Sequence, residues 1–270
     1  MKRETLVLTV GYLVLAVVML TGSLFLWNAQ NHITTSIVER EEAKNPAEIE
    51  LTLITPPDCT ACADGNVLIQ KIEKQNVRIL KSETIASISE NALAMIATYG
   101  IERLPALLVK GEYDKENVSD FFMQLDGKEN NGVLVIQPNQ PVYFDLTKNE
   151  VAGLVTITYL TDSSCNDCYD PKIHKAILEK NFGMTIVAEK TVDAQSQEGR
   201  AILSTYAIKE TPAILLSSQA VAYTGLTSIW EGVGSVEADG TFVFRANEAF
   251  GSVIYKNLET GETIRPTDAK

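Results

Sequence analysis

Histidine is scarce in this 270-residue sequence, in which only His32 and His174 occur. Such scarcity argues against histidine-rich metal sites and against Ser-His-Asp or Cys-His triads, so His174 is interpreted as a packing or surface residue. Positively charged residues are also few: the chain has 23 Lys and Arg and 35 Asp and Glu, which gives a formal net charge of −12. A surface this acidic does not attract phosphate backbones, and we expect no nucleic-acid partner.

One segment lacks charge altogether. No Asp, Glu, Lys or Arg occurs between Thr5 and Val38, and residues 6–27 are apolar apart from a few small or hydroxylated residues. Twenty-two helical residues span about 33 Å, which is enough to cross a hydrocarbon core of about 30 Å. We therefore predict a transmembrane signal-anchor helix within residues 1–30. A cleaved signal peptide is the alternative, although its apolar core is usually only about 7–15 residues long.

The charges on either side of this segment predict its orientation. Lys2 and Arg3 precede it, whereas the residues after it include three glutamates and one arginine at 39–42. Because positive charge stays on the cytoplasmic side, we expect a single-pass protein of the cell membrane with its N-terminus in the cytoplasm. Residues 31–46 are interpreted as a tether. The rest of the chain is expected outside the cytoplasm, where disulfides form and persist.

The remainder of the chain is an internal duplication. Shifts of 106, 107 and 108 residues superpose matching residues: Cys59 on Cys165, Cys62 on Cys168, Pro105 on Pro212, and Gly132 on Gly240. Because chance identities do not keep so steady a register, the sequence predicts two units, at residues 47–153 and 154–262, followed by a C-terminal tail at 263–270.

Each unit is predicted to alternate strands and helices as β-α-β-α-β. The first unit has predicted strands and helices, in chain order, at 50–54, 66–75, 77–80, 87–99 and 106–110. The second has them at 155–160, 172–180, 184–188, 198–206 and 213–216. Each unit then adds a short helix and a β-rich extension. We therefore expect an α/β fold in which helices cover a mixed sheet.

All four cysteines belong to two Cys-x-x-Cys pairs, Cys59/Cys62 and Cys165/Cys168, each between a predicted strand and a predicted helix. Zinc is disfavoured, because zinc ribbons usually place the second pair about 15–20 residues after the first. A structural disulfide is the stronger alternative. It does not explain why an X-Pro step follows each first cysteine at a separation of 46 or 47 residues.

This combination of strand, Cys-x-x-Cys, helix and strand-opening proline resembles the thioredoxin superfamily, over most of residues 50–110 and 155–217. The resemblance implies two tandem thioredoxin-like domains, laid out like the two-domain protein disulfide oxidoreductases. It implies cis peptide bonds at Leu104–Pro105 and Thr211–Pro212, each close to its own cysteine pair. It also implies that the backbone of Leu104 and Thr211 is free to bind an extended substrate peptide.

The resemblance assigns roles to the cysteines. Cys59 and Cys165 would be the attacking thiolates, one residue before a helix whose amides favour negative charge, and Cys62 and Cys168 would resolve the mixed disulfides. Redox-active disulfides of this kind need no cofactor and no metal. The sequence departs from the family pattern at Leu53 and Tyr159, which stand where thioredoxins keep a buried acid.

Aspartates near the motifs add two further expectations. At Asp64 and Asp170 the helix after each cysteine pair is predicted to kink or to begin again, with the aspartate as its N-cap, which weakens the helix dipole at the cysteines. Asp58 and Asp64 lie near the first pair, whereas Asp162, Asp167 and Asp170 lie near the second. Asp167 lies inside the second motif itself, where its negative charge disfavours a thiolate. We therefore expect a higher pKa for Cys165 than for Cys59, and a lower reduction potential for the second pair.

The sequence leaves three functions open. The first is a membrane-anchored, extracytoplasmic thiol–disulfide oxidoreductase that acts on protein thiols and disulfides. The second is a non-catalytic binding module whose disulfides are structural. The third is an electron relay between the two pairs that serves a membrane redox partner. Oxidation, reduction and isomerisation are not distinguished, because direction depends on reduction potential.

Overall fold

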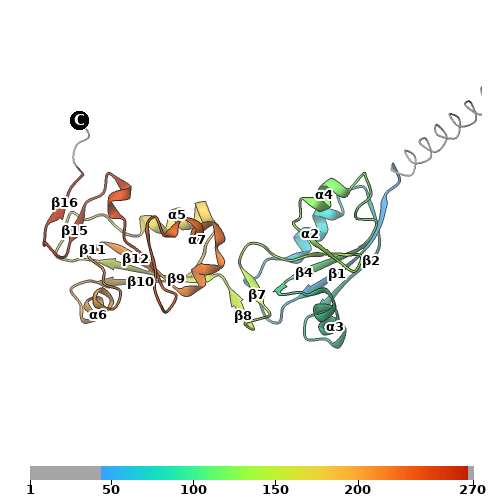
Figure 1. The fold of residues 1–270 in the computed structure, drawn as a ribbon, viewed down its shortest axis with the longest axis horizontal. Coiled ribbons are helices and arrows are strands. Elements are labelled where there is room, and N and C mark those ends of the chain that lie inside the picture. Colours follow the sequence, from blue (N-terminus) through green and yellow to red (C-terminus); the bar gives the residue numbers. More distant parts are fainter. Residues whose placement is uncertain (1–43, 267–270) are drawn as a thin grey trace, which may run out of the picture.

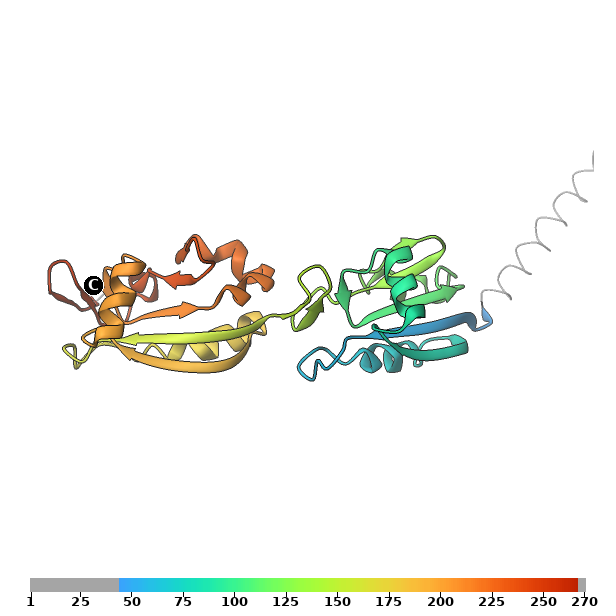
Figure 2. The ribbon, with the colours of Figure 1, turned by 90° about the horizontal axis from the view of Figure 1, so that it is seen from below.

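The computed structural model describes residues 44–266, so the membrane helix predicted within residues 1–30 lies outside the described residues. Among residues 44–266, no helix has both the length and the apolar character needed to cross a membrane. Figure 1 shows two sheet-containing units that follow one another. The hairpin of β7 (Tyr143–Asp145) and β8 (Glu150–Ala152) connects them, as Figure 2 also shows.

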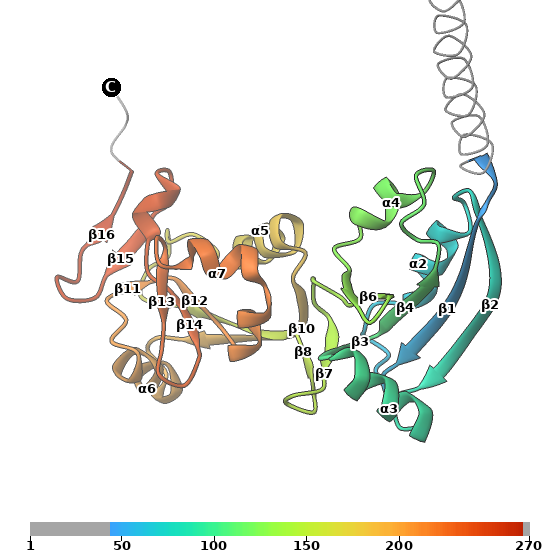
Figure 3. The same ribbon diagram turned by 45° about the vertical axis from the view of Figure 1, so that its right-hand side comes forward.

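The first unit is built on a five-stranded sheet of order β2-β1-β4-β6-β5. Its strands are β1 (Ala47–Thr55), β2 (Val77–Ala86), β4 (Ala106–Gly111), β5 (Lys128–Asn130) and β6 (Val133–Ile136), and its helices are α2 (Gly65–Ile72), α3 (Glu90–Tyr99) and α4 (Ser119–Met123). β1 and β2 are parallel, whereas β4 runs antiparallel to both β1 and β6. Figure 3 shows α2 and α4 on one face of the sheet and α3 on the other.

The second unit repeats this plan with the order β10-β9-β12-β14-β13. Its strands are β9 (Leu154–Thr161), β10 (Thr185–Asp193), β12 (Ala213–Leu216), β13 (Gly234–Val236) and β14 (Phe242–Phe244), and its helices are α5 (Ile173–Phe182), α6 (Gln197–Thr205), α7 (Thr224–Trp230) and the 3-10 turns η1 (Ser218–Ala222) and η2 (Asn247–Phe250). The predicted mixed α/β architecture is confirmed. Two sheets of this order and these strand directions fit tandem thioredoxin-like folds.

Alternation along the first strand of each unit decides which residues enter which core. Ile49 and Leu51 of β1 point to the face covered by α2 and α4, while Ile54 packs with α3. In β9, Ile157 packs with the helices α5 and α7, and Leu160 packs toward α6. Because successive side chains of a strand point to opposite faces, each central strand serves two cores.

Two small sheets complete the units. One has the order β3-β7-β8, with β3 at Arg103–Leu104. The other has the order β11-β15-β16, formed by β11 (Glu210–Thr211), β15 (Tyr255–Asn257) and β16 (Thr263–Ile264). Residues 263–264 were predicted to belong to a C-terminal tail, and this boundary is wrong because their backbone pairs with β15.

Candidate functional site

Each cysteine pair lies in the loop between the first strand and the first helix of its unit. The sulfur atoms of Cys59 and Cys62 are bonded at 2.04 Å, and those of Cys165 and Cys168 at 2.02 Å. All four cysteines are half-buried. Both disulfides are therefore placed where a partner thiol can approach them.

The cysteines do not lie one residue before a helix, so that placement is wrong, whereas the predicted new start of the helices close to Asp64 and Asp170 is confirmed. The helix α2 begins at Gly65 and α5 only at Ile173, because turns intervene. Asp64 caps α2 as predicted, its carboxylate accepting from the Asn66 amide at 2.9 Å. Asp170 instead accepts from the Lys172 amide in a turn that precedes α5. Helix amides therefore give a thiolate little support here, since the dipole acts within about one turn.

Both proline bonds are cis, as predicted: Leu104–Pro105 and Thr211–Pro212. The sulfur of Cys168 lies 3.9 Å from the carbonyl oxygen of Thr211. In the first unit, Pro105 and Ala63, the residue after Cys62, line one cleft. The fold therefore brings each proline beside its own cysteine pair.

The backbone next to each proline is not free, which corrects the prediction for Leu104 and Thr211. Leu104 pairs with Phe144 of β7, and Thr211 pairs with Lys256 of β15. The Leu146 amide donates to the Glu102 carbonyl, and the Leu258 amide to the Lys209 carbonyl, each at 2.8 Å. Because hydrogen-bonded and non-hydrogen-bonded pairs alternate, the pairs of Leu104 and Thr211 are also hydrogen-bonded. A substrate strand can use these edges only after the hairpin moves.

The hairpins β7–β8 and β15–β16 are also hydrogen-bonded to the cysteine loops through the residues that precede them. The amide of Ala63 donates to the Val142 carbonyl at 3.1 Å, just before β7. The amide of Tyr169, at the equivalent position of the second unit, donates to the Ile254 carbonyl at 2.9 Å, just before β15. Each disulfide therefore has its cis-proline on one side and the residue just before β7 or β15 on the other.

Asp162, which the sequence places among the acids near the second pair, is a buried carboxylate, and this burial was not predicted. The side chain of Asp162 is 0% exposed, and its charge faces the Lys256 ammonium at 3.6 Å. It also accepts from the Ser164 hydroxyl at 2.6 Å, from Gln195 at 3.0 Å and from the Thr211 hydroxyl at 3.3 Å. Burial acts to raise the pKa of Asp162, but the hydrogen bonds from Ser164 and Gln195 and the charge of Lys256 outweigh it and hold that pKa below its usual value.

The first unit has no such carboxylate, because Pro56 stands at the equivalent position. Comparing the two repeats at a shift of 106 is the signal that distinguishes Asp162 from the other acids. The C-terminal hairpin also supplies Arg265, which pairs with Asp167. Two of the three acids near the second pair, Asp162 and Asp167, are therefore paired with cations. The lower reduction potential expected for the second pair stays a prediction, and these cations act against it.

Tyr169 centres a second polar network in this unit. Its hydroxyl donates to Asn247 Oδ1 at 2.8 Å and lies 3.1 Å from His174 Nε2 and 3.5 Å from the Pro212 carbonyl oxygen. Asn247, which is buried, in turn donates to the Glu210 carboxylate at 3.2 Å. The network therefore ties the residue after Cys168 to the cis-proline from inside the unit.

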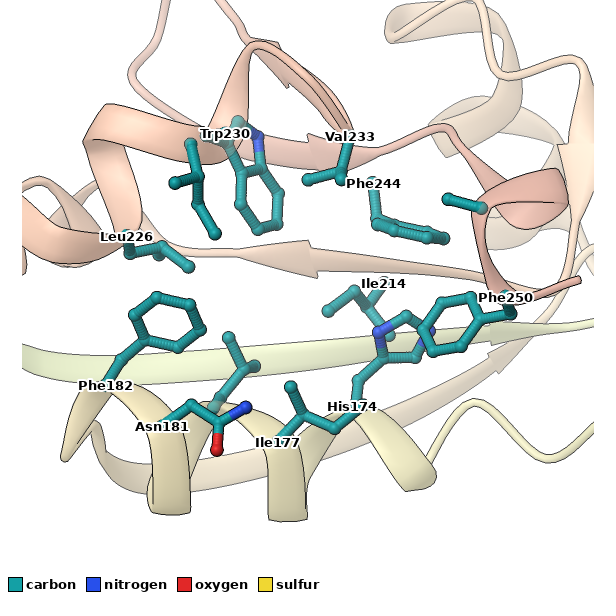
Figure 4. A pocket seen from close by; sticks show the side chains of 13 residues that line it. His174, Ile177, Asn181, Phe182, Ile214, Leu226, Trp230, Val233, Phe244 and Phe250 are labelled. Carbon is teal, nitrogen blue, oxygen red and sulfur yellow. The ribbon is translucent and has the colours of Figure 1, made fainter.

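His174 stands at one end of an apolar cavity of about 250 Å³ between α5 and α7. Figure 4 shows its imidazole next to the Phe250 ring, with Phe182 and Leu226 toward the other end. Its ring centroid lies 4.6 Å from that of Phe244 and 5.0 Å from that of Phe250. Burial lowers the pKa of His174 to about 4, so its role is packing with a neutral ring.

The part of the chain from 44 to 266 holds no group of three or more His, Cys, Asp or Glu side chains that is placed to bind a metal ion. The cysteines of the two loops can carry thiol–disulfide exchange themselves. A bonded pair can be opened by a thiolate, and the reduced pair can attack a disulfide.

No protein-family model and no curated protein matches this chain. Solved structures that overlap it include an alkylhydroperoxide reductase from Enterococcus faecalis, at 15% identity, covering 68% of this chain and 88% of the other, with a TM-score of 0.20. The protein disulfide oxidoreductase from Aeropyrum pernix overlaps at 17% identity, covering 66% and 79%, with a TM-score of 0.19. Overlaps this low define neither fold nor function, and the strand order carries the assignment of the fold.

Proposed function

We propose that the protein is a thiol–disulfide oxidoreductase that acts on protein thiols through both cysteine pairs. The observation that carries the proposal is the double occurrence of one arrangement: a half-buried Cys-x-x-Cys disulfide after a central strand, beside a cis-proline. A purely structural disulfide has no need of this arrangement in both units. The attacking role of Cys59 and Cys165 and the resolving role of Cys62 and Cys168 are part of the proposal.

The exchange balances in two steps. A substrate thiolate attacks Cys59 Sγ, the Cys59–Cys62 bond breaks, and Cys62 leaves as a thiolate that takes a proton. A second substrate thiolate then attacks the substrate sulfur of this mixed disulfide, and Cys59 leaves. Two substrate cysteines are thereby oxidised to a disulfide and the pair is reduced. The reverse sequence reduces a substrate disulfide, and the same steps apply to Cys165 and Cys168.

We further propose that an N-terminal helix anchors the protein with its two units outside the cytoplasm. The uncharged segment at 6–27, the preceding Lys2 and Arg3, and the dependence of disulfides on an oxidising compartment support this. Protease added to spheroplasts is expected to degrade residues 44–266, and the intact protein to stay with membranes after a salt wash. A salt-extractable, shortened product would contradict the anchor.

Trapping of mixed disulfides tests the proposed exchange. The full-length chain with Cys62→Ser and Cys168→Ser is expected to accumulate disulfide-linked partners, because no second thiol remains to release them. The chain with Cys59→Ser and Cys165→Ser is the matched control, and it is expected to accumulate none. Non-reducing electrophoresis from the cells that make the protein gives the result. Capture by neither variant would favour a binding module with structural disulfides.

The placement of the second pair argues against direct relay between the two disulfides. Cys165 follows the C-terminal end of β9, whereas the connecting hairpin lies at the N-terminal end of that strand. Eight extended residues span about 26 Å, so the loop that carries this pair lies at the end of β9 that is remote from the hairpin. Exchange needs contact between sulfur atoms, and a third thiol would have to carry electrons between the pairs.

A further inference from the structure

A cleft of about 190 Å³ opens beside the first disulfide. We call it the first-site cleft and define it by residues from three parts of the unit: Leu53, Ala63, Leu68, Pro105, Ile136 and Asn139. Apolar side chains form most of its wall. Asn139 is exposed, and its side chain makes no hydrogen bond to another described residue. The cleft therefore combines an apolar space with one unused amide group.

Residues that line the first-site cleft have counterparts in the second unit, because the chain is an internal duplication. At shifts of 106 to 108, counterparts in the second unit are Tyr169 for Ala63, His174 for Leu68, Pro212 for Pro105 and Asn247 for Asn139. The structure supports this register for the cysteine loops, since the amides of Ala63 and Tyr169 make equivalent bonds to the residues before β7 and β15. It also supports a shift of 108 for β6 and β14, because Val135 pairs with Leu108 and Val243 with Leu215. Asn139 and Asn247 match as the third residues after the ends of these two strands, and beyond them the second unit has extra residues before β15.

In the second unit the corresponding space holds the ring of Tyr169. Its hydroxyl reaches Asn247, His174 and the Pro212 carbonyl, which are the counterparts of three residues that line the first-site cleft. Its ring centroid lies 6.1 Å from that of Phe250. The second site thus carries its own aromatic occupant, while the first has only the methyl group of Ala63 there.

We infer that the first-site cleft takes an aromatic side chain, tyrosine above all, from the protein that exchanges with Cys59–Cys62. This inference rests on the proposed exchange function. Tyr169 shows the ligand chemistry that the shared framework accepts: an apolar ring whose hydroxyl meets an asparagine and a proline carbonyl. Because β7 occupies the edge beside Leu104, side-chain capture in the cleft replaces strand pairing as the means of holding the substrate. The second site lacks this selectivity.

Two versions of the full chain isolate the sites. Cys165→Ser with Cys168→Ser leaves only the first pair, and Cys59→Ser with Cys62→Ser leaves only the second. Each reduced protein is mixed with short cysteine peptides, activated as thiopyridyl disulfides, that carry Tyr, Phe or Ala on both sides of the cysteine. The protein thiolate attacks the cysteine sulfur of the peptide and forms a mixed disulfide between protein and peptide. The leaving group is thiopyridone, whose absorbance gives the rate.

The Tyr-to-Ala rate ratio is expected to be about tenfold at the first site and about one at the second, because only the first has room for a ring. Ala63→Tyr in the first-site protein should bring the ratio to about one, and Tyr169→Ala in the second-site protein should raise it. Ratios are compared so that changes in thiol reactivity cancel. Equal ratios at the two sites would overturn the inference.

Asn139→Ala keeps the inference testable if Ala63→Tyr fails to fold. This variant should remove the preference for Tyr over Phe while keeping the preference for Phe over Ala. An unchanged Tyr-to-Phe ratio would contradict a hydrogen bond from the substrate hydroxyl to Asn139. Failure of the proposed function gives a different result, in which no peptide reacts at either isolated site faster than with free glutathione.

Discussion

Replacing Asp162 with alanine is expected to lower the free energy of unfolding of the second unit by about 3 kcal/mol, the lower end of the cost of breaking a buried ion pair. Its carboxylate is fully buried and faces Lys256, whose side chain is 19% exposed. The change also removes the acceptor for Thr211 and Gln195. Urea unfolding of the full chain, followed by circular dichroism, measures the loss.

Asp167→Ala is the matched control for this prediction. Asp167 also pairs with a cation of the C-terminal hairpin, but both partners are 58% exposed. Exposed ion pairs contribute less than about 1 kcal/mol, so this variant should unfold close to the wild-type urea midpoint. Asp162→Asn keeps the shape of the side chain and separates the loss of charge from the loss of packing. Equal midpoints for Asp162→Ala and Asp167→Ala would contradict the buried network.

Acid is expected to destabilise the second unit through His174. Burial lowers the pKa of His174 from 6.5 to about 4, so the unfolded chain binds this proton first as the pH falls. Stability is therefore fully present above pH 6.5 and is lost as the pH falls toward about 4. A shift of this size corresponds to about 3 kcal/mol. The fluorescence of Trp230, measured during urea unfolding in a chain with Trp27→Phe, reports on this unit.

His174→Leu is the control, because Leu68 stands at the equivalent position of the first unit. The variant should lose the part of the pH dependence that falls between pH 6.5 and about 4, while the contribution of the carboxylates remains. The quantity compared is the free energy of unfolding of the wild type and of His174→Leu, measured at several pH values between 6.5 and about 4. The same pH dependence in both proteins would show that the pKa of His174 does not differ between the folded and the unfolded chain, which would contradict its burial as a neutral ring.

Residue patterns predicted the duplication and the central strands well, and the edge strands poorly. β1 and β9 have apolar residues at alternate positions, which predicts a strand with one face in the core. β2 and β10 run to Ala86 and Asp193, beyond the predicted ends at residues 80 and 188. Several of their added residues, such as Lys81 and Ser82, are polar and exposed, and join the sheet through their backbones. Side-chain hydrophobicity carries no signal for such an edge.

The cysteines and the cis-prolines were predictable from the sequence because each motif is local and occurs twice. Their surroundings were not. β3 and β11 have only two residues each, too few to show a period, and their pairing joins Leu104 to Phe144 and Thr211 to Lys256. The burial of Asp162 likewise depends on Lys256, 94 residues further on. Contacts at such separations are set by the folded chain rather than by a local pattern.

The reduction potentials of the two disulfides test the central claim most directly. The site-isolated chains, equilibrated with glutathione buffers and trapped with a thiol reagent, give one midpoint for each pair. Exchange-active pairs are expected between about −120 and −270 mV, with Cys165–Cys168 at the lower potential of the two. Both pairs remaining oxidised below about −300 mV would mark them as structural disulfides and would contradict the proposed function.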